Sequence, residues 1–241
     1  MPEQYKRQFY EKTHRDDWDQ IKLHGILGYL FLRLRRFEKS RGEAVFELLP
    51  YGEKLLDVGC GDGSLVWRAL EKFEEVYGID IALSAVCKAQ IKINTNHLGL
   101  AKTYLMLANL DLQAPFKEAS FDAITCVAVL EHLFDPYHVI SEFHRLLRKE
   151  GILIINVPNT ACLPYRLSLL LGRLPITSPH HCRGSWDAGH LHYFTFEALT
   201  KLLEEQGFQV VQRSGSGVFA EYRRWWLPLL SADIILKAVK R

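Results

Sequence analysis

The chain has 241 residues, of which 48% are hydrophobic, and its 30 basic and 28 acidic side chains leave a formal net charge of +2. This length and apolar content are typical of one globular domain, and the small net charge argues against a nucleic-acid partner because it supplies no basic field. The five cysteines are scattered and odd in number, which predicts a reduced, cytoplasmic protein.

Residues 1–50 are expected to form a helical cap ahead of the main domain. Their polar, charged beginning is neither a secretory signal nor a membrane span. A stripe of apolar residues follows at helical spacing, with lysine and arginine beside it: Ile21, Ile26, Leu27, Leu30, Phe31 and Leu34. The stripe would either dock on the main domain, where it would cap a substrate cleft, or lie on a membrane surface as a basic amphipathic helix. A second helical pattern runs from Phe37 to Leu49.

A glycine-rich turn follows the first predicted strand, Leu55 to Val58. Gly59, Gly61 and Gly63 occupy alternate positions before a helical pattern that starts near Ser64. Glycine permits positive φ and a close approach of the backbone to a ligand, and the N-terminus of a helix directs N–H groups at that ligand. The third glycine comes one residue too early for the dinucleotide pattern G-x-G-x-x-G. We therefore expect a nucleotide-like ligand here, and not an oxidoreductase.

A second strand, Glu75 to Asp80, follows a helix predicted over Leu65 to Phe73. Asp80 ends this strand about twenty residues past the glycines, where a parallel sheet can accept the diol of a nucleotide ribose. The alternative is that Asp80 only caps the next predicted helix, Ala82 to Thr95. The spacing favours the diol.

The rest of the chain alternates strands with helices. Further strands are predicted at Thr103–Leu107, Ala123–Val127 and Ile152–Val157, helices at Tyr137–Arg148 and Phe196–Gln206, and two last strands at Phe208–Arg213 and Asp233–Val239. This order predicts an α/β fold over residues 51–241, with a doubly wound, seven-stranded, mostly parallel sheet whose last two strands pair as an antiparallel hairpin at the edge. An insertion, residues 160–192, follows the fifth strand and is expected to form a lid.

Four stretches of the chain carry a family resemblance. In chain order they are LLDVGCGDGSL, VYGID, APFKEASFDAITCVAVLEHLFDPYHVISEFHRLLRKEGILIINVPN and HLHYFTFEALTKLLEEQGF. From Leu55 to Phe208 the chain resembles class I S-adenosylmethionine-dependent methyltransferases, in particular ubiquinone-biosynthesis-type and methionine-biosynthesis-type relatives. The resemblance implies a Rossmann-like methyltransferase fold and S-adenosylmethionine as the cofactor, with S-adenosylhomocysteine as its product.

The resemblance also implies a set of cofactor-binding residues: Asp57, Gly59, Cys60, Gly61, Gly63, Asp80, Ile81, Asn109, Leu110, Asp111 and Val127. In such enzymes the glycines approach the methionine and ribose parts of the cofactor, and the acid at position 57 holds the methionine ammonium directly or through water. The loop after the third strand meets adenine. Either Asn109 or Asp111 would accept from the adenine amine, and Asp111 could instead be a solvated loop acid.

One departure from the family concerns metal binding. Ubiquinone-type relatives often have E-x-x-E-H at the end of the fourth strand, which can hold a divalent cation, but here Ala128 stands at the first position and only Glu131 and His132 remain. Two ligands make a poor cage for a hard cation, so we expect no metal site and expect these two residues to begin the next helix. A zinc site built from His180, His181, Cys182, His190 and His192 is disfavoured, because adjacent histidines seldom share a metal and a C-x-x-C pair is absent.

Methyl transfer is an in-line displacement in which the cofactor supplies the electrophile, and a hydroxyl acceptor also requires a base. His132, His190 and His192 are the candidate catalytic residues. Positions 190 and 192 share a face if the stretch is strand-like. Their role is then that of a base or a substrate contact, or that of hydrogen bonds which tie the insertion to the core.

We expect an enzyme that methylates a small molecule at oxygen. Methylation at nitrogen or carbon, or a partner or regulatory protein that binds the cofactor without catalysis, is the alternative. The chain would be a monomer or a homodimer with no membrane span, because the late apolar run from Trp225 to Val239 is interrupted by Pro228 and Asp233. Peripheral membrane contact is compatible with the N-terminal stripe and with a rim formed by the insertion and Tyr222 to Trp226.

Overall fold

The protein is described here from a computed structural model, which covers residues 7–8, 10–11, 38–96, 101–174, 177, 186–218 and 224–241. The N-terminal stripe of residues 21–34 lies outside the described residues. The same is true of His180, His181 and Cys182, so the zinc alternative that used them is outside them as well.

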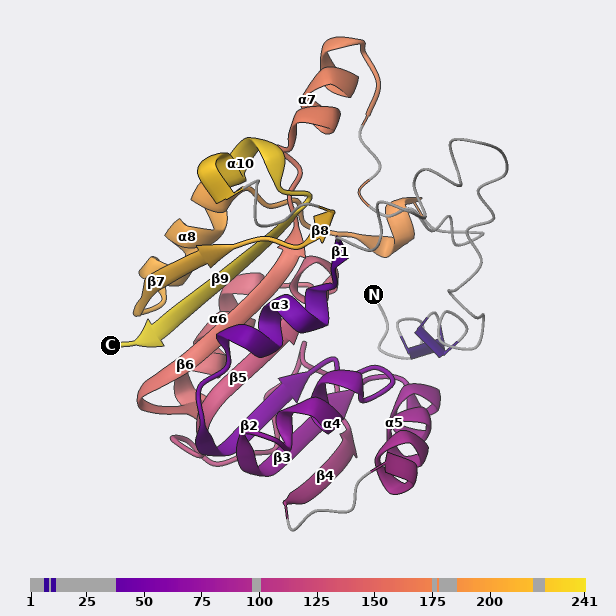
Figure 1. Cartoon of the computed structure of the whole chain (residues 1–241), viewed down its shortest axis with the longest axis vertical. Helices are drawn as coiled ribbons and strands as arrows, with labels where there is room; N and C mark the ends of the chain where they lie inside the picture. The colour runs from indigo at the N-terminus through magenta and orange to yellow at the C-terminus, as the bar shows by residue number, and fades with distance from the viewer. Residues whose placement is uncertain are drawn as a thin grey trace.

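Seven strands form one mixed sheet (Figure 1). They are β2 (Gly52–Val58), β3 (Phe73–Asp80), β4 (Lys102–Leu107), β5 (Phe121–Val127), β6 (Leu147–Pro158), β7 (Phe208–Ser214) and β9 (Asp233–Lys240), in the spatial order β4-β3-β2-β5-β6-β9-β7. The pairs from β4 to β6 are parallel, and β9 runs antiparallel to both β6 and β7. The predicted α/β fold with a seven-stranded, mostly parallel sheet and one antiparallel hairpin is confirmed. A second, two-stranded sheet pairs β1 (Glu38–Lys39) with β8 (Gly217–Val218).

The hairpin does not lie wholly at the edge, as the sequence suggested. β9 is inserted between β6 and β7, and β7 alone forms the edge. Apolar side chains of β9 are buried on both faces, with Ile234 and Leu236 in one core cluster and Ile235 in the other. β7 is largely exposed along its length. A strand that is apolar on both faces is stable inside a sheet, whereas a polar one can occupy an edge.

Helices cover both faces of the sheet, which makes it doubly wound (Figure 1). They are α3 (Arg41–Leu48), α4 (Ser64–Ala69), α5 (Leu83–Asn96), α6 (Pro136–Leu146), α7 (Leu163–Leu170), α8 (Phe196–Glu205) and α10 (Leu227–Leu230), with short 3-10 turns η2 (Leu130–His132), η3 (Trp186–Gly189) and η4 (Arg224–Trp226). α6 and α8 pack on the face that carries Leu56, while α3 and α4 pack on the face that carries Leu55. Successive strand residues point to opposite faces, so this pair of leucines separates the two layers.

Several predicted helices are longer than the observed ones. The helix predicted over residues 65–73 ends at Ala69, and Phe73 already belongs to β3. The helix predicted over residues 137–148 ends at Leu146, because Leu147 and the residues after it pair in β6. The helix predicted from residue 37 begins at Arg41, since Ser40 and Glu43 form a capping box that fixes its start.

Glu131 and His132 do not begin the next helix, contrary to the sequence-based expectation. They lie in the separate turn η2, and α6 starts at Pro136. Asp135 is the N-cap of α6, because its side chain accepts hydrogen bonds from the N–H groups of Tyr137 and His138.

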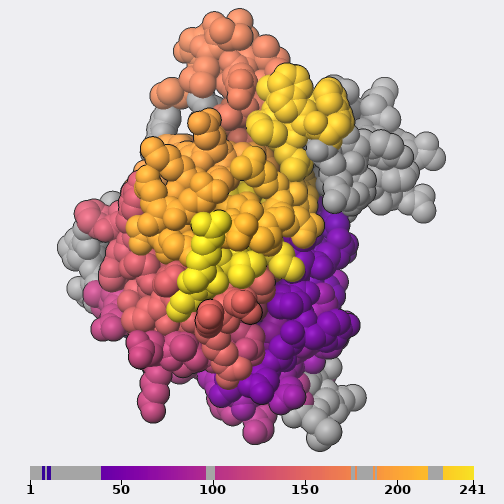
Figure 2. Space-filling model, turned by 90° about the vertical axis from the view of Figure 1, so that its left-hand side faces the viewer, coloured from indigo at the N-terminus to yellow at the C-terminus, as the bar shows by residue number. Residues whose placement is uncertain are grey.

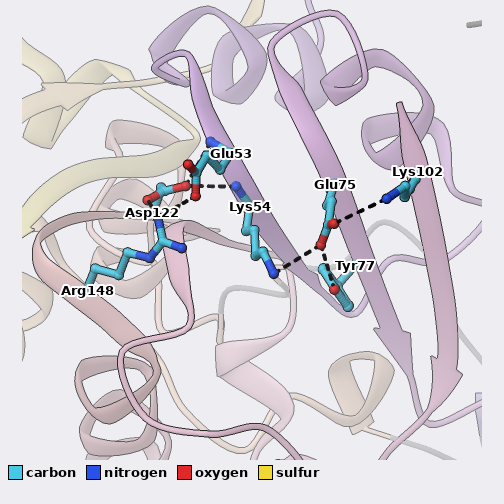
Figure 3. A network of polar contacts seen from close by, with 7 residues as sticks. All are labelled: Glu53, Lys54, Glu75, Tyr77, Lys102, Asp122 and Arg148. Carbon is cyan, nitrogen blue, oxygen red and sulfur yellow. Dashed lines mark hydrogen bonds and ion pairs between the residues drawn. The ribbon is translucent and has the colours of Figure 1, made fainter. Parts of the chain in front are cut away.

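A network of ion pairs and hydrogen bonds joins the amino ends of the parallel strands (Figure 3). Its members are Glu53, Lys54, Glu75, Tyr77, Lys102, Asp122 and Arg148. The carboxylate of Asp122 accepts from the backbone N–H groups of Glu53 and Lys54, at 2.8 Å each, and from Arg148 at 2.7 Å. Glu75 accepts from the Tyr77 hydroxyl at 2.9 Å and pairs with Lys54 at 3.2 Å. Glu53 accepts from Arg148 at 3.0 Å, so every acid of this network has a donor.

Among the described residues, none of the helices combines the length and the apolar character that crossing a bilayer requires.

Candidate functional site

The glycine turn connects β2 to α4 at the carboxyl edge of the sheet. Gly59 has φ +69°, and a Cβ at this position would lie 2.1 Å from Cγ2 of Val129, so only glycine fits. Gly61 has φ +53° and no atom within 4 Å of its would-be Cβ, so this part of the turn is open to a ligand. The N–H groups of Gly59 and Cys60 donate to the carbonyl of Ile79 at 2.8 and 3.0 Å. The turn is thus held against the end of β3.

Asp80 connects the glycine turn to α5. It is buried, and its two oxygens accept from the N–H of Gly61 at 3.0 Å and from the N–H of Ala82 at 2.9 Å. The alternative reading, a contact with the start of the next helix, is met in part by the bond from Ala82, and the ribose contact stays a prediction. A carboxylate has about four acceptor sites, so these two bonds leave capacity for a ribose diol. Ile81, the neighbour of Asp80, is half-buried beside it.

Asp57 lies within the end of β2 and is only 3% exposed. Its oxygen accepts from the Thr125 hydroxyl at 2.7 Å. Burial raises the pKa of Asp57 to about 7. The hydrogen bond from Thr125 opposes this rise, and the nearby charges of Asp80 and Asp62 add to it. A buried carboxyl in this position would be stabilised in its ionised form by a cationic ligand group.

The loop after β4 lies beside Asp80, since the N–H of Ala108 donates to the Asp80 carbonyl at 2.9 Å. Asn109 accepts from the N–H of Asp111 at 3.1 Å through its side-chain oxygen, and the Asp111 carboxylate accepts from the N–H of Phe134 at 2.7 Å. Asp111 is therefore not merely a solvated loop acid, because it joins two loops at the carboxyl edge. Leu110 between them packs against the core.

The segment after β5 approaches the glycine turn through Val129. Val127 ends β5 opposite Asn156 of β6, and Ala128 adopts a positive φ of 53°, which is uncommon for a residue with a Cβ. The chain then forms η2, in which the N–H of His132 donates to the Val129 carbonyl at 2.9 Å. The turn that carries Glu131 and His132 thus begins in direct contact with Gly59.

Glu131 is 1% exposed, and neither carboxyl oxygen has a hydrogen-bond partner in the part of the chain that the structure describes. Burial raises the pKa of Glu131 to about 8, against the opposing effects of its own nearby backbone and of the charge of Arg41. The carboxyl is therefore largely protonated at neutral pH. An unsatisfied buried carboxyl is costly, and such groups are often found at functional sites.

His190 joins this group from the insertion. One ligand atom from each of Glu131, His132 and His190 lies within 4.8 Å of the others, and the two imidazole rings have centroids 4.6 Å apart. The main chain brings them together, since the N–H groups of Leu191 and His192 donate to the Glu131 carbonyl at 2.8 and 3.1 Å. Sequence spacing could not show this arrangement, because positions 132 and 190 are far apart in the chain.

Two residues that the sequence did not single out orient His190. The Thr177 hydroxyl donates to the Asp187 carboxylate at 2.7 Å and lies 2.7 Å from Nδ1 of His190. A hydroxyl has one proton. Because that proton is directed at Asp187, Nδ1 of His190 must be the donor to Thr177, and Nε2 carries a lone pair. Burial lowers the pKa of His190 below its usual value, against the charge of Asp187, so the ring is neutral at pH 7.

His192 does not join the group. Its Nε2 lies 3.2 Å from the carbonyl of Phe134, and its ring is tilted against Phe194. This contact connects the insertion to the loop after η2, as the structural alternative predicted. Of the three histidines considered from the sequence, the structure brings His132 and His190 together and leaves His192 beside them.

The residues present do not fit the hard divalent cation that an E-x-x-E-H motif can hold. Hard cations require mainly oxygen ligands, whereas Glu131, His132 and His190 offer one carboxyl and two imidazoles, and the carboxyl retains its proton at neutral pH. A softer cation such as Zn²⁺ accepts imidazole ligands, and it would compete with a proton for Nε2 of His190.

A family model described as "Methyltransferase domain" matches residues 30–213. Ubiquinone biosynthesis O-methyltransferase from Glaesserella parasuis serovar 5 is 32% identical over 121 residues, which are 50% of this chain and 51% of that protein. A probable S-adenosylmethionine-dependent methyltransferase from Mycolicibacterium smegmatis is 27% identical over 181 residues, which are 73% of this chain and 60% of that protein. The chain therefore spans roughly half to three fifths of the length of these relatives.

Solved structures show the same fold. Magnesium protoporphyrin IX methyltransferase from Synechocystis PCC 6803, crystallised with bound SAH, superimposes with a TM-score of 0.68 at 21% identity and covers 99% of both chains. The [4+2]-cyclase SpnF superimposes with a TM-score of 0.62 at 16% identity and covers 99% of this chain and 96% of its own. Since the second protein is named for a cyclisation, the shared fold does not by itself specify a reaction.

Proposed function

Because the chain belongs to the methyltransferase-domain family, we propose that it transfers the methyl group of S-adenosylmethionine to an oxygen atom of a small molecule. The observation that carries the choice of oxygen is the orientation of His190, whose ring lies against that of His132 and whose Nδ1 is held by Thr177, so that Nε2 keeps the basic lone pair. A hydroxyl acceptor requires a base in this position. The five scattered cysteines, odd in number, agree with the proposed cytoplasmic location.

In this proposal the cofactor occupies the carboxyl edge above β2, β3 and β4. The open face of Gly61 and the neighbouring Gly63 and Cys60 approach its methionine and ribose parts, and Asp80 accepts from the ribose diol. The methionine ammonium lies near Asp57, whose buried carboxyl loses its proton to match that charge. Ile81, Leu110 and Val127 supply apolar contacts around adenine and the methyl group, and the adenine amine donates to Asn109 or Asp111.

Nε2 of His190 takes the proton from the hydroxyl group of the methyl acceptor while the oxygen of that hydroxyl group attacks the methyl carbon. When bound, S-adenosylmethionine would supply the methyl electrophile, and its sulfur would keep the electron pair of the broken carbon–sulfur bond as a neutral thioether. The imidazolium that forms on His190 donates through Nδ1 to Thr177, and the charge of Asp187 stabilises it. His132, whose ring lies against His190, and His192 at the rim contact the acceptor in the same proposal.

The first test of this function is calorimetric binding of S-adenosylmethionine and S-adenosylhomocysteine to the purified protein, followed by an acceptor screen that measures S-adenosylhomocysteine release. We expect phenols and other hydroxyl compounds to be methylated in a His190-dependent reaction. If only amines were methylated, and the His190→Ala variant retained full activity, the oxygen assignment would be wrong. If neither cofactor bound, the methyltransferase proposal itself would fail.

The tautomer of His190 can be measured without knowledge of the acceptor. In ¹⁵N-histidine-labelled protein, the two ring nitrogens of a neutral imidazole have different chemical shifts, and the His190→Ala variant assigns the resonances. We expect Nδ1 to carry the proton in the native protein, and the Thr177→Val variant to lose this preference. A native ring protonated at Nε2 would contradict the proposed base.

A further inference from the structure

The helix α7 has no buried residue, although most of its side chains are apolar. Leucines in and after it have exposed fractions between 40% at Leu163 and 81% at Leu170. Leu167, Leu171 and Leu174 lie within the same range. A helix on the surface of a globular protein normally buries an apolar stripe and exposes a polar one. α7 instead leaves its leucines exposed.

A second apolar segment lies near α7. Trp225 and Trp226 of η4 are 76% and 51% exposed, and α10, which follows them, has no buried residue. Figures 1 and 2 both show α10 beside α7 at the same end of the molecule. We name the set of Leu167, Leu170, Leu171, Leu174, Trp225 and Trp226 the leucine–tryptophan surface. Large exposed apolar patches usually mark a site of interaction.

The two segments that carry this surface are basic in sequence. Residues 160–174 contain Arg166 and Arg173 and no acidic residue, and two arginines directly precede the two tryptophans, with Glu221 as the one nearby acid. Leucine with interfacial tryptophan and flanking arginine is the composition of segments that lie in the boundary of a bilayer. An anionic lipid surface attracts such arginines at short range.

The shape of this end of the molecule also favours a lipid surface over a partner protein. In Figure 2, α7 projects outward from the body of the protein as a protrusion, and its leucines are exposed. A projecting helix can insert between lipid headgroups, whereas a partner helix would require a groove to bind in.

From these observations we propose that the leucine–tryptophan surface binds the surface of an anionic lipid bilayer. α7 begins at Leu163, shortly after β6 ends at Pro158. The carboxyl end of β6 lies at the same edge of the sheet as the glycine turn. Docking through α7 would therefore turn this edge of the sheet toward the lipid.

The proposal is tested by co-sedimentation with vesicles of phosphatidylcholine alone and of phosphatidylcholine mixed with phosphatidylglycerol. We expect the full chain to bind the anionic vesicles, with binding that weakens as salt is added. The double variant Leu170→Asp, Leu171→Asp should lose at least about tenfold in binding, because it places two charges in the inserted surface.

The matched control is Ile91→Asp in α5, since Ile91 is 68% exposed and lies on a different element. It should bind vesicles as the native chain does. Circular dichroism and S-adenosylmethionine binding check that each variant is folded. The proposal is overturned if the native chain binds neither vesicle or if the double variant binds like the native chain. It is also overturned if the native chain has no affinity for lipid and sedimentation velocity shows that it is a dimer which the two substitutions dissociate, since the surface would then bind a second copy of the chain.

Discussion

The two ends of the parallel sheet differ in how their carboxyl groups are compensated, because at the carboxyl end Asp80 has two N–H donors but two other buried acids do not. At the amino end, Asp122 accepts from two backbone N–H groups and from Arg148, and Glu75 accepts from a hydroxyl and pairs with lysines (Figure 3). At the carboxyl end, and within the described residues, Asp57 accepts a hydrogen bond only from the Thr125 hydroxyl, and the Glu131 carboxyl has no hydrogen-bond partner. The acids of the amino end are compensated by the protein itself.

The difference shows in the protonation of these groups. Hydrogen bonding from Tyr77 and Lys54 keeps the pKa of Glu75 below its usual value, while burial raises the pKa of Asp57 to about 7 and of Glu131 to about 8. Paired charges contribute to the stability of the fold, whereas buried acids without a cation are retained at a cost and are common at binding sites. The comparison predicts that substitutions at the carboxyl end should change binding and catalysis, and those at the amino end only stability.

The largest effect is expected for His190→Ala. Removal of the proposed base should lower kcat/KM for a hydroxyl acceptor by about 10²- to 10⁴-fold, with no change in S-adenosylmethionine affinity. His138→Ala is the control, because His138 is an exposed imidazole in α6. Initial rates of methyl transfer measure the effect, and equal rates in the two variants would falsify the role of His190.

Added Zn²⁺ should inhibit, and a chelator should not. A zinc ion bound by Glu131, His132 and His190 would occupy Nε2, which the proposed reaction needs as a proton acceptor. Activity measured with EDTA and with increasing zinc tests this expectation. Loss of activity in EDTA, restored by a divalent cation, would mean that the site uses a metal after all.

Asp80→Ala should weaken S-adenosylmethionine binding by about 1.5 to 3 kcal/mol, or about 10- to 150-fold in Kd, the scale of hydrogen bonds to a charged group. The variant loses the proposed ribose contact and also the support of Gly61. Asp80→Asn, whose single side-chain oxygen can still accept from one of the two N–H groups, should lose less. Calorimetry gives both values, and an unchanged Kd in Asp80→Ala would refute the ribose assignment.

Cofactor binding should release a proton from Asp57 below neutral pH. The unliganded carboxyl has a pKa raised to about 7, so it is protonated at pH 6, and the ammonium of the cofactor would favour its ionised form. Affinity should therefore rise with pH by up to about 1.4 kcal/mol per unit until pH 7 and then level off. Calorimetry at pH 6 in buffers of different ionisation enthalpy measures how many protons are released when the cofactor binds. Asp57→Asn should abolish the release, and a release that persists in this variant would assign it to another group.

Asp57 also predicts the pH dependence of stability in the absence of cofactor. Its folded pKa lies above its unfolded value, so the folded protein binds the proton more tightly. Its contribution to stability is fully present below the unfolded pKa of about 3.9 and declines as pH rises to about 7. Urea denaturation of the native chain and of Asp57→Asn across this range isolates the contribution.

The smallest effect on function is expected at the amino end. Asp122→Ala removes hydrogen bonds to two backbone N–H groups and to Arg148, and should lower the free energy of unfolding by about 1 to 2 kcal/mol. Cofactor Kd and kcat should stay at native values. A denaturant titration and a binding isotherm on the same preparation provide both measurements. A change in Kd would show that the two ends of the sheet are coupled.

Much of the architecture was readable from local sequence. The apolar runs at residues 55–58 and 152–157 and the alternate glycines at 59, 61 and 63 predicted the parallel sheet and its ligand-binding edge, because burial and positive φ select residue types directly. Helix ends were less accurate. The helix ends predicted at Phe73 and Arg148 were wrong. Both residues are as compatible with a strand as with a helix, and in the structure they belong to β3 and β6.

The sequence by itself determined the fold class, the glycine turn and the placement of Asp57 and Asp80 at strand ends, because each depends on a few consecutive residues and their periodicity. The tertiary structure alone decided that β9 lies inside the sheet, that His190 meets Glu131 and His132, and that Thr177 and Asp187 orient its ring. These contacts join segments far apart in the chain, and they are selected by packing of the whole sheet and by the need to satisfy buried polar groups, which no local pattern records.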